Sequence, residues 1–264
     1  MNIPHMYTVA HKKVECVPDG YCLLQVGAKN SPHFAECTDD TGENISELNG
    51  SFCEITGLYW LWKNTDDPYL GVTHYRRYFM KNFWTTSYKN ILTPEELGYY
   101  LEDCDLIIPR PYAFKSTSRD AYGAVHYVED LDRTRNILEY MSPESVPYFD
   151  YILQRRTLSL CNMFVAKREI FDKYMQWLMP ILFECSNRID TSTYSVYDKR
   201  LIGYLAEWLS NVWVYMNNVK IKYVPIAQTD RSRLDNIARP IAKFLLYPYH
   251  NHLIHRDIVR RDSL

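Results

Sequence analysis

The sequence lacks the patterns that identify several common enzyme and metal-binding classes. Its seven cysteines are odd in number and scattered, with no C-x-x-C pair, which argues against a disulfide framework or a zinc site of the usual spacing. H-E-x-x-H, Walker, G-x-G-x-x-G and G-x-S-x-G motifs are also missing. Zinc proteases, P-loop enzymes, Rossmann dehydrogenases and serine hydrolases therefore lack their signatures in this chain.

Long apolar runs are missing as well. No stretch approaches the roughly 18 apolar residues of a membrane span, and no charged-then-apolar leader opens the chain. Together with the unpaired cysteines, these features predict a soluble, cytoplasmic protein with reduced thiols.

Positive charge is concentrated near the C-terminus. The chain carries a formal charge of −2, and from position 220 onward nine Lys/Arg stand against four Asp/Glu, a net of +5 that leaves −7 for the rest. This distribution argues against a nucleic-acid binder, which needs a basic footprint. Residues 227–264 are predicted as a basic, aromatic tail, which could contact an anionic membrane surface or form an ordinary solvated segment.

Aromatic residues are abundant, with 23 tyrosines, 10 phenylalanines and 6 tryptophans among 264 residues. Tyrosine and tryptophan combine an apolar body with a polar tip. The excess suits a surface that stacks on a ligand or a sugar, and it suits a thick aromatic core equally well.

Strand-like and helix-like patterns alternate through most of the chain, which is typical of an α/β sheet with helices on its faces. A capping-box spacing of Ser51 and Glu54 predicts a helix that begins there, and Thr93 followed by Pro94 predicts another. The expected strands are 6–12, 21–28, 69–75, 105–109, 160–166 and 220–226, and the expected helices are 51–64, 93–104, 167–185 and 198–217.

Polar residues follow three of the expected strands, at His11, at Gly27 and in the segment "HYRRY" from His74 to Tyr78. Ligands of α/β sheets bind beyond the carboxyl ends of strands. Side chains alternate along an extended chain, so we expect one of Arg76 and Arg77 to reach a cleft while the other braces a loop or a carboxylate. Arginine suits phosphate because its planar fork donates two parallel hydrogen bonds; a salt bridge on the sheet rim is the alternative.

Acidic residues offer several weaker candidates. The loop "DDTGENIS", from Asp39 to Ser46, could bind a metal, hold ribose hydroxyls or form a turn. The D-x-D segment from Asp103 to Asp105 precedes its strand, which is the wrong end for a metal site. Glu207 is a lone acid in an apolar helix, either an exposed position or a carboxylate whose pKa burial raises toward that of a general base; Asp190 and Asp198 compete with it.

Several segments in order resemble a bacterial family known as domain of unknown function 4422: "QVGA", "DDTGENIS", "CEITGLYWLWKN", "GVTHYRRYF", "CDLIIP", "NMFVAKREIFDKYMQWL" and "RLIGYLAEWL". The resemblance runs from about residue 8 to 226 and leaves the tail uncovered. Members of this family occur among capsular, exopolysaccharide and O-antigen assembly proteins and are regarded as glycosyltransferases.

The resemblance implies a single GT-A-like nucleotide-binding sheet flanked by helices in residues 1–226, with a helical C-terminal half on the acceptor side. It implies transfer of a sugar, our choice being galactose in pyranose or furanose form, from a UDP-linked donor to a lipid-linked or oligosaccharide acceptor at the inner face of the membrane. No cofactor is implied, although a divalent metal stays open, since the two arginines stand where metal-binding acids are expected.

Three groups of site residues follow. The predicted catalytic residues are Glu207 as the base with Arg76 and Arg77 at the diphosphate; the predicted donor-binding residues are His11, Lys12, Gly27, Asp39, Asp40, Asn44, His74 and Tyr75; and the predicted acceptor-binding residues are Trp62, Asn162 and Arg200. The alternatives are a sugar-phosphate transferase, which releases a nucleoside monophosphate, and a non-catalytic binding module of a polysaccharide assembly complex.

Overall fold

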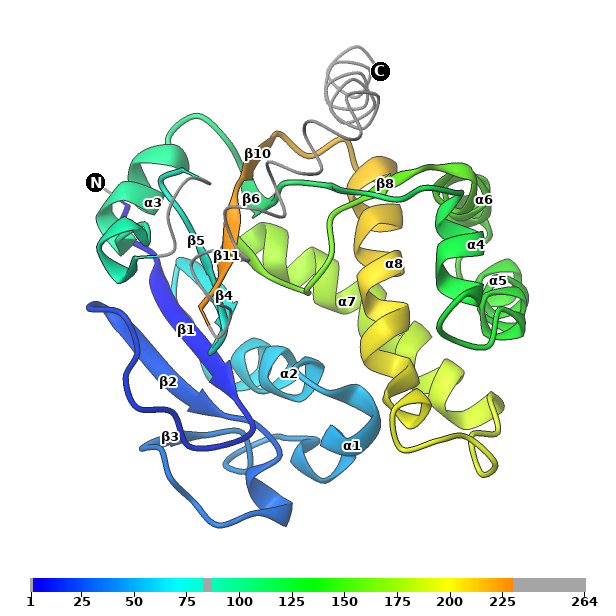
Figure 1. Cartoon of the computed structure of the whole chain (residues 1–264), viewed down its shortest axis with the longest axis horizontal. Coiled ribbons are helices and arrows are strands. Elements are labelled where there is room, and N and C mark those ends of the chain that lie inside the picture. The colour runs from blue at the N-terminus through cyan, green and yellow to red at the C-terminus, as the bar shows by residue number, and fades with distance from the viewer. Residues whose placement is uncertain (1, 83–86, 230–264) are drawn as a thin grey trace.

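A nine-stranded sheet lies at the centre of the computed structural model, which describes residues 2–82 and 87–229 (Figure 1). Seven strands hydrogen-bond in the order β10-β6-β9-β4-β1-β2-β3, and β5 joins β4 to β11. β9 is antiparallel to both β4 and β6, whereas the other neighbours in this series are parallel. The strands are β1 (His5–Ala10), β2 (Tyr21–Gln25), β3 (Cys37–Thr38), β4 (Tyr69–His74), β5 (Arg77–Phe79), β6 (Leu106–Pro109), β9 (Phe164–Lys167), β10 (Ile221–Val224) and β11 (Ile226–Gln228), with β7 (Tyr112–Ala113) and β8 (Thr157–Leu158) forming a separate pair.

Helices pack on the sheet and build a second, helical half. In Figure 1, α7 runs from the sheet toward this half, where α4, α5 and α6 lie beside α8. The α-helices are α1 (Asn49–Phe52), α2 (Ile55–Asn64), α3 (Pro94–Tyr100), α4 (Ser118–Gly123), α5 (Glu129–Met141), α6 (Val146–Gln154), α7 (Arg168–Arg188) and α8 (Leu201–Met216), and the short 3₁₀ helices are η1 (Ala28–Asn30), η2 (Ser46–Leu48), η3 (Tyr88–Asn90), η4 (Pro143–Ser145) and η5 (Asp198–Arg200).

The α/β class predicted from the sequence is confirmed, and each of the six expected strands overlaps a strand of the sheet. The predicted start of α3 is also confirmed, because the Thr93 hydroxyl accepts from the Glu96 backbone and the Glu96 carboxylate accepts from the Thr93 backbone. The helix expected over 51–64 is wrong at its start. Cys53 adopts a positive φ of 52° and separates α1 from α2, so the Ser51–Glu54 capping box does not form.

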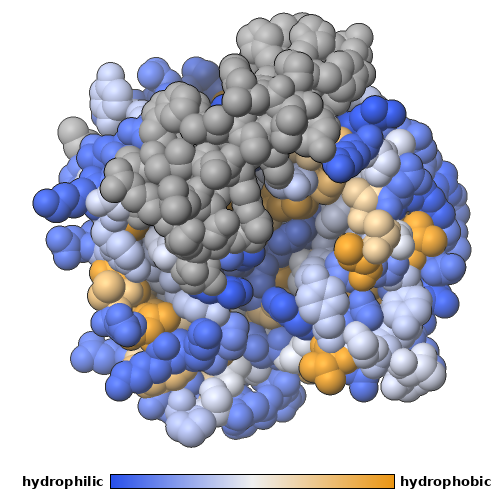
Figure 2. Space-filling model, in the orientation of Figure 1, coloured by the Kyte–Doolittle hydropathy of each residue, from blue (hydrophilic) through white to orange (hydrophobic). Residues whose placement is uncertain are grey.

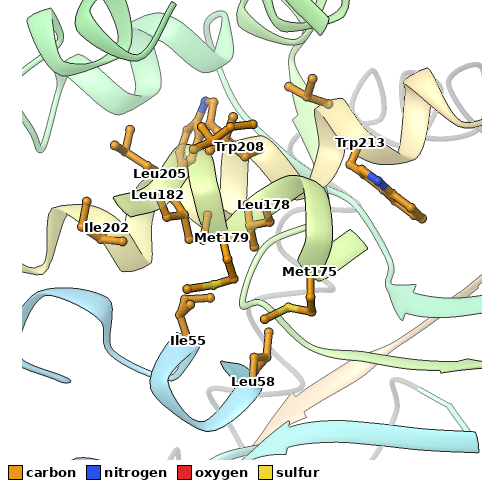
Figure 3. Packing of buried hydrophobic residues seen from close by; sticks show 14 of the residues in the cluster. Ile55, Leu58, Met175, Leu178, Met179, Leu182, Ile202, Leu205, Trp208 and Trp213 are labelled. Carbon is orange, nitrogen blue, oxygen red and sulfur yellow. The ribbon is translucent and has the colours of Figure 1, made fainter. Parts of the chain in front are cut away.

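The core that joins the two halves is formed by α2, α7 and α8. Ile55, Leu58, Met175, Met179 and Leu205 are each at most 1% exposed. Figure 3 shows the two methionines of α7 pointing toward Ile55 and Leu58 of α2. Burial of one such side chain stabilises the fold by about 1.5–3 kcal/mol. Because eleven of the sixteen residues of α8 are buried, this helix is held firmly against its neighbours.

Two observations concern the predicted division of the chain into a domain and a C-terminal tail. The boundary expected at residue 226 falls within β11, and residues 230–264 of the predicted tail lie outside the described residues. In the part of the chain that the structure describes, no helix has the length and apolar character needed to cross a membrane.

A buried aspartate fixes the turn that follows β2. Asp39 is fully buried directly after β3, and its carboxylate accepts hydrogen bonds from the backbone N–H of Gly27 and of Ala28 at 2.9 and 3.0 Å. The hydroxyls of Ser46 and Thr56 also donate to it. Gly27 has a φ of 68°, a conformation that favours glycine. These four hydrogen bonds therefore hold the backbone at the carboxyl end of β2 in one shape.

The substitution Asp39→Asn should destabilise the protein by about 1–3 kcal/mol, because the new NH₂ group faces donors and leaves buried N–H or O–H groups without an acceptor. Urea unfolding measures the effect. The neighbouring Asp40→Asn is the control, since Asp40 is less buried than Asp39 and its ion pair is with the exposed ring of His33, a kind of pair that is worth about 0–1 kcal/mol. Equal destabilisation by both variants would contradict the role of Asp39.

Candidate functional site

A cleft of about 770 Å³ opens at the carboxyl ends of β1, β2 and β4, opposite α1, η5 and the start of α8. Figure 2 shows hydrophilic residues around a hollow between the two halves of the molecule. The volume lies within the range of about 300–1,000 Å³ that is usual for small-molecule sites. Eight of the predicted site residues line this cleft: His11, Gly27, His74, Tyr75, Arg76, Arg77, Arg200 and Glu207.

Both arginines of the "HYRRY" segment line the cleft, so the expectation that they face opposite ways is wrong. β4 ends at His74, which pairs with Arg77 at the start of β5, and Tyr75 and Arg76 form the turn between the two strands. The backbone N–H of Tyr75 donates to the carbonyl of Val9 at 3.1 Å. A turn does not follow the alternation of an extended chain, so both residues can line the same cleft.

The ring of Tyr75 lies among three basic side chains. Arg76 is 5.0 Å and the Lys12 Nζ atom 5.6 Å from the centre of this ring, and the His11 ring contacts it edge-on at 5.5 Å. Burial, followed by the charges of Lys12 and Arg76, lowers the pKa of His11 below its usual value. Arg77, in contrast, has no hydrogen-bond or ion-pair partner for its guanidinium among the described residues. This leaves its fork available for an anion.

The helical wall of the cleft contributes a third arginine. The Nε atom of Arg200 lies 3.2 Å from the Sγ atom of Cys53, and its guanidinium lies 5.5 Å from the centre of the Tyr204 ring. Burial raises the pKa of Cys53 to about 11, so this thiol is neutral at pH 7. Gly203 permits the close approach of α8 to α1, since a Cβ atom there would lie 3.0 Å from Cys53.

Glu207, the single acid of α8, faces the cleft from a helix that is otherwise largely buried. One oxygen, Oε1, accepts a hydrogen bond from the backbone N–H of Cys161 at 2.9 Å. Burial, followed by the negative charge of Glu54, raises the pKa of Glu207 to about 7, while the Cys161 N–H, Arg77 and Arg200 act in the opposite direction. A carboxylate with such a pKa can accept and release a proton near neutral pH.

A second carboxylate of the cleft, Glu54, was missed in the sequence, where it matched a helix cap. Its Oε1 atom accepts a hydrogen bond from the Nδ2 atom of Asn162 at 2.8 Å and lies 3.8 Å from the Nε2 atom of His74. Burial lowers the pKa of His74 to about 4, so this imidazole is neutral at pH 7. No local pattern signals the role of Glu54, because Cys53 ends α1 and leaves Glu54 at the start of α2 instead of inside a helix that begins at Ser51.

The other predicted binding residues do not line the cleft. Asp39 is buried under Gly27, and Asp40 contacts His33. Asn44 bonds the backbone of its own loop, at Gly42 and Ser46.

Three more predicted residues, Lys12, Trp62 and Asn162, contact other side chains without lining the cleft themselves. The Nζ atom of Lys12 lies 5.6 Å from the centre of the Tyr75 ring, which lines the cleft. The Nζ atom of Lys63 lies 4.0 Å from the centre of the Trp62 indole. Asn162 is 8% exposed, and its amide contacts Glu54. The binding roles assigned to these residues stay predictions.

Acidic residues do not gather as a metal site in the described ranges 2–82 and 87–229, where no three His, Cys, Asp or Glu side chains converge in a suitable way. The D-x-D segment lies at the start of β6, where Asp105 pairs with Lys167 at 2.6 Å. Of the two competitors of Glu207, Asp198 contacts His126 and Ser195, and Asp190 accepts from the backbone of Ser192. Neither of the two lines the cleft.

Comparisons with known proteins agree with this architecture. The family model described as "Domain of unknown function (DUF4422)" matches residues 5–218. A solved apo structure, described as the WbbM bifunctional glycosyltransferase, is similar with a TM-score of 0.79 and 28% sequence identity. The similarity covers 87% of this chain but 46% of the other, so this chain corresponds to slightly less than half of that protein. No curated protein sequence matches the chain.

Glu207→Gln should stabilise the protein at pH 8. A carboxylate whose pKa is raised on folding lowers stability as the pH rises from its unfolded pKa, here 4.5, to its folded pKa of about 7. The gain at pH 8 should reach at most about 3 to 4 kcal/mol, since each pKa unit is worth about 1.4 kcal/mol, and it should vanish near pH 4.5.

Urea unfolding at several pH values measures this gain, with Glu47→Gln as the control because Glu47 is exposed. A gain that does not depend on pH would contradict the raised pKa of Glu207.

Proposed function

This chain belongs to the family described as domain of unknown function DUF4422, and from that premise we propose that it is a glycosyltransferase. It moves a sugar from a nucleotide-sugar donor to an acceptor hydroxyl. The observation that carries the proposal is the cleft, where Arg76, Arg77 and Arg200 lie around Glu207, a carboxylate with a pKa of about 7. The similarity to a bifunctional glycosyltransferase supports this class of reaction.

The strand-end side of the cleft suits the donor. Arg76 and Arg77 hold the diphosphate and compensate the negative charge that grows on it as the bond between sugar and phosphate breaks. Arg77 has the stronger claim because its guanidinium has no partner among the described residues. His11 and Gly27, which line the same side, hold the nucleoside. We propose a UDP-linked donor sugar, with galactose in pyranose or furanose form as the first candidate.

Glu207 serves as the general base in a direct displacement. The acceptor hydroxyl gives its proton to the ionised carboxylate of Glu207, its oxygen forms a bond to the anomeric carbon, and the bond from that carbon to the diphosphate oxygen breaks. The nucleoside diphosphate leaves with the bonding electron pair. A base whose pKa lies near the working pH is half ionised there and transfers protons efficiently.

The helical wall suits the acceptor. Tyr197 and Tyr204 line it beside Arg200, and aromatic rings can stack on sugars through their apolar faces. We propose a lipid-linked or oligosaccharide acceptor of a bacterial capsule, exopolysaccharide or O-antigen, at the cytoplasmic face of the membrane. In this proposal the catalytic domain, expected over residues 1–226, continues to the end of β11 at Gln228, and the basic tail that follows contacts anionic lipid.

The test is incubation of the full chain with UDP-, GDP-, dTDP- and CMP-sugars and candidate acceptors, with and without EDTA. Thermal shifts identify the donor, since a ligand of the folded state raises its stability. Release of a nucleoside diphosphate supports glycosyl transfer, whereas release of a nucleoside monophosphate identifies a sugar-phosphate transferase. Binding without turnover favours a non-catalytic module. Loss of turnover in EDTA identifies a requirement for a divalent ion.

Arg77→Ala should weaken donor binding by about 10- to 100-fold, because a charge-assisted hydrogen bond contributes roughly 1.5–3 kcal/mol. Calorimetry with the nucleoside diphosphate measures this loss. Arg156→Ala is the matched control, since Arg156 is exposed and lies outside the cleft. Equal affinity of the parent and Arg77→Ala would remove Arg77 from the diphosphate site.

Glu207→Gln should lower kcat by about 10²- to 10⁴-fold, the usual contribution of a general base. In the parent, kcat/KM should rise with pH through about 7, because the base must be ionised to accept a proton. The variant should lack this rise while retaining donor affinity. If its rate stays within a factor of two of the parent's, the base is another residue.

A further inference from the structure

Two consecutive residues with left-handed backbone conformations lie next to the carboxylates of the cleft. Cys161 has a φ of 87° and Asn162 a φ of 46°, and one residue, Met163, separates them from β9. Asparagine tolerates this region better than most residues, but each such conformation of a non-glycine residue still costs about 1–3 kcal/mol. The turn therefore persists because surrounding contacts hold it.

The contacts of this turn lead to both glutamates of the cleft. The backbone N–H of Cys161 donates to Glu207, and the Nδ2 atom of Asn162 donates to Glu54 at 2.8 Å and to the carbonyl of Gly203 at 3.1 Å. Both partners of Nδ2 can only accept, so they fix which way the amide points. One short turn thus holds a carboxylate at the start of α2 and another in α8.

We propose that Asn162 is a positioning residue that holds Glu54 beside Glu207, so that the turn of Cys161 and Asn162 fixes the two carboxylates as one unit. This proposed role differs from the acceptor contact predicted for Asn162, whose side chain is buried and donates to Glu54. The inference rests on the proposed function, because it concerns the residue that takes the proton in the transfer reaction.

The arrangement controls how tightly Glu207 holds its proton. The Asn162 amide holds the carboxylate of Glu54 by a hydrogen bond, and the negative charge of Glu54 raises the pKa of Glu207. Without the amide, the carboxylate of Glu54 loses the donor that holds it in place and moves away from Glu207. This reduces the negative potential at Glu207, which then loses its proton at lower pH. The other charged or titratable groups around the pair are His11, Cys53, His74, Arg76, Arg77, Cys161, Tyr174 and Arg200.

The test titrates the full chain, labelled with ¹³C at the glutamate carboxyls, by NMR. The signal of Glu207 is identified by its loss in Glu207→Gln. Asn162→Gly removes the amide while glycine still adopts the positive φ. Asn218→Gly is the matched control, because Asn218 also has a φ of 46° but is exposed and does not line the cleft.

Asn162→Gly should lower the titration midpoint of Glu207 by about one pH unit, and Asn218→Gly should leave it unchanged. Glu54→Gln should lower the midpoint as well, and adding Asn162→Gly to it should produce no further change, because both act through the charge of Glu54. A midpoint in Asn162→Gly equal to that of the parent would falsify the proposal. A further shift in the double variant would also overturn it.

Glu54→Asp provides a second measurement if Asn162→Gly does not fold. It keeps the charge but shortens the side chain and withdraws the carboxylate from Asn162, so the midpoint of Glu207 should again fall. An unchanged midpoint overturns the positioning role. Because the NMR signal needs no turnover, a chain that transfers no sugar contradicts the proposed function and leaves this result standing. In an active chain, the rise of kcat/KM with pH should move together with the NMR midpoint.

Discussion

Repulsion between two glutamates in one partly buried cleft is the constraint on which the rest of the site depends. The negative charge of Glu54 raises the cost of ionising Glu207, and the N–H of Cys161 and the charges of Arg77 and Arg200 act against this effect. When Glu207 carries a proton, three arginines stand against a single carboxylate. The cleft is then positively charged where the strands end, which favours an anionic group at that place.

These charges come from segments that are far apart in the chain, and the packing of the core keeps them together. Glu54 lies at the junction of α1 and α2, Arg77 begins β5, and Glu207 belongs to α8. The contacts of α2 and α8 with α7 fix the two acids relative to each other (Figure 3). The strand ends are fixed independently by the sheet, so a rigid framework surrounds the cleft on both sides.

The parts of the site that follow simple local rules could be predicted from the sequence. Strand-ending positions such as His11 and Gly27 follow from apolar runs that stop at polar residues, and Glu207 is conspicuous as a lone acid in an apolar helix. Alternation along a strand could not predict the direction of Arg76 and Arg77. β4 ends at His74, so Arg76 lies in a turn and Arg77 begins the next strand.

Other features depend on partners distant in sequence. Glu54 matched a capping box in the sequence, but this box does not form because Cys53 adopts a positive φ. Cys53 lies close to Gly203 of α8, a residue far away in the sequence. Asp39 resembled a ligand residue, yet its four donors come from three separate segments and bury it completely. Such packing leaves no local pattern in a single sequence. The positions of Glu54 and Asp39 could therefore not be predicted, because contacts with distant segments determine them.

The pairing of β5 with β11 has a consequence for how this family is divided into fragments. Arg77 pairs with Gln228, and the backbone N–H of Thr229 donates to the carbonyl of Arg76 at 2.9 Å. The family match ends at residue 218, before β10 and β11 begin. A fragment cut at that boundary would lose the strand that secures the arginine turn, so the smallest unit fit for ligand work extends at least through residue 229.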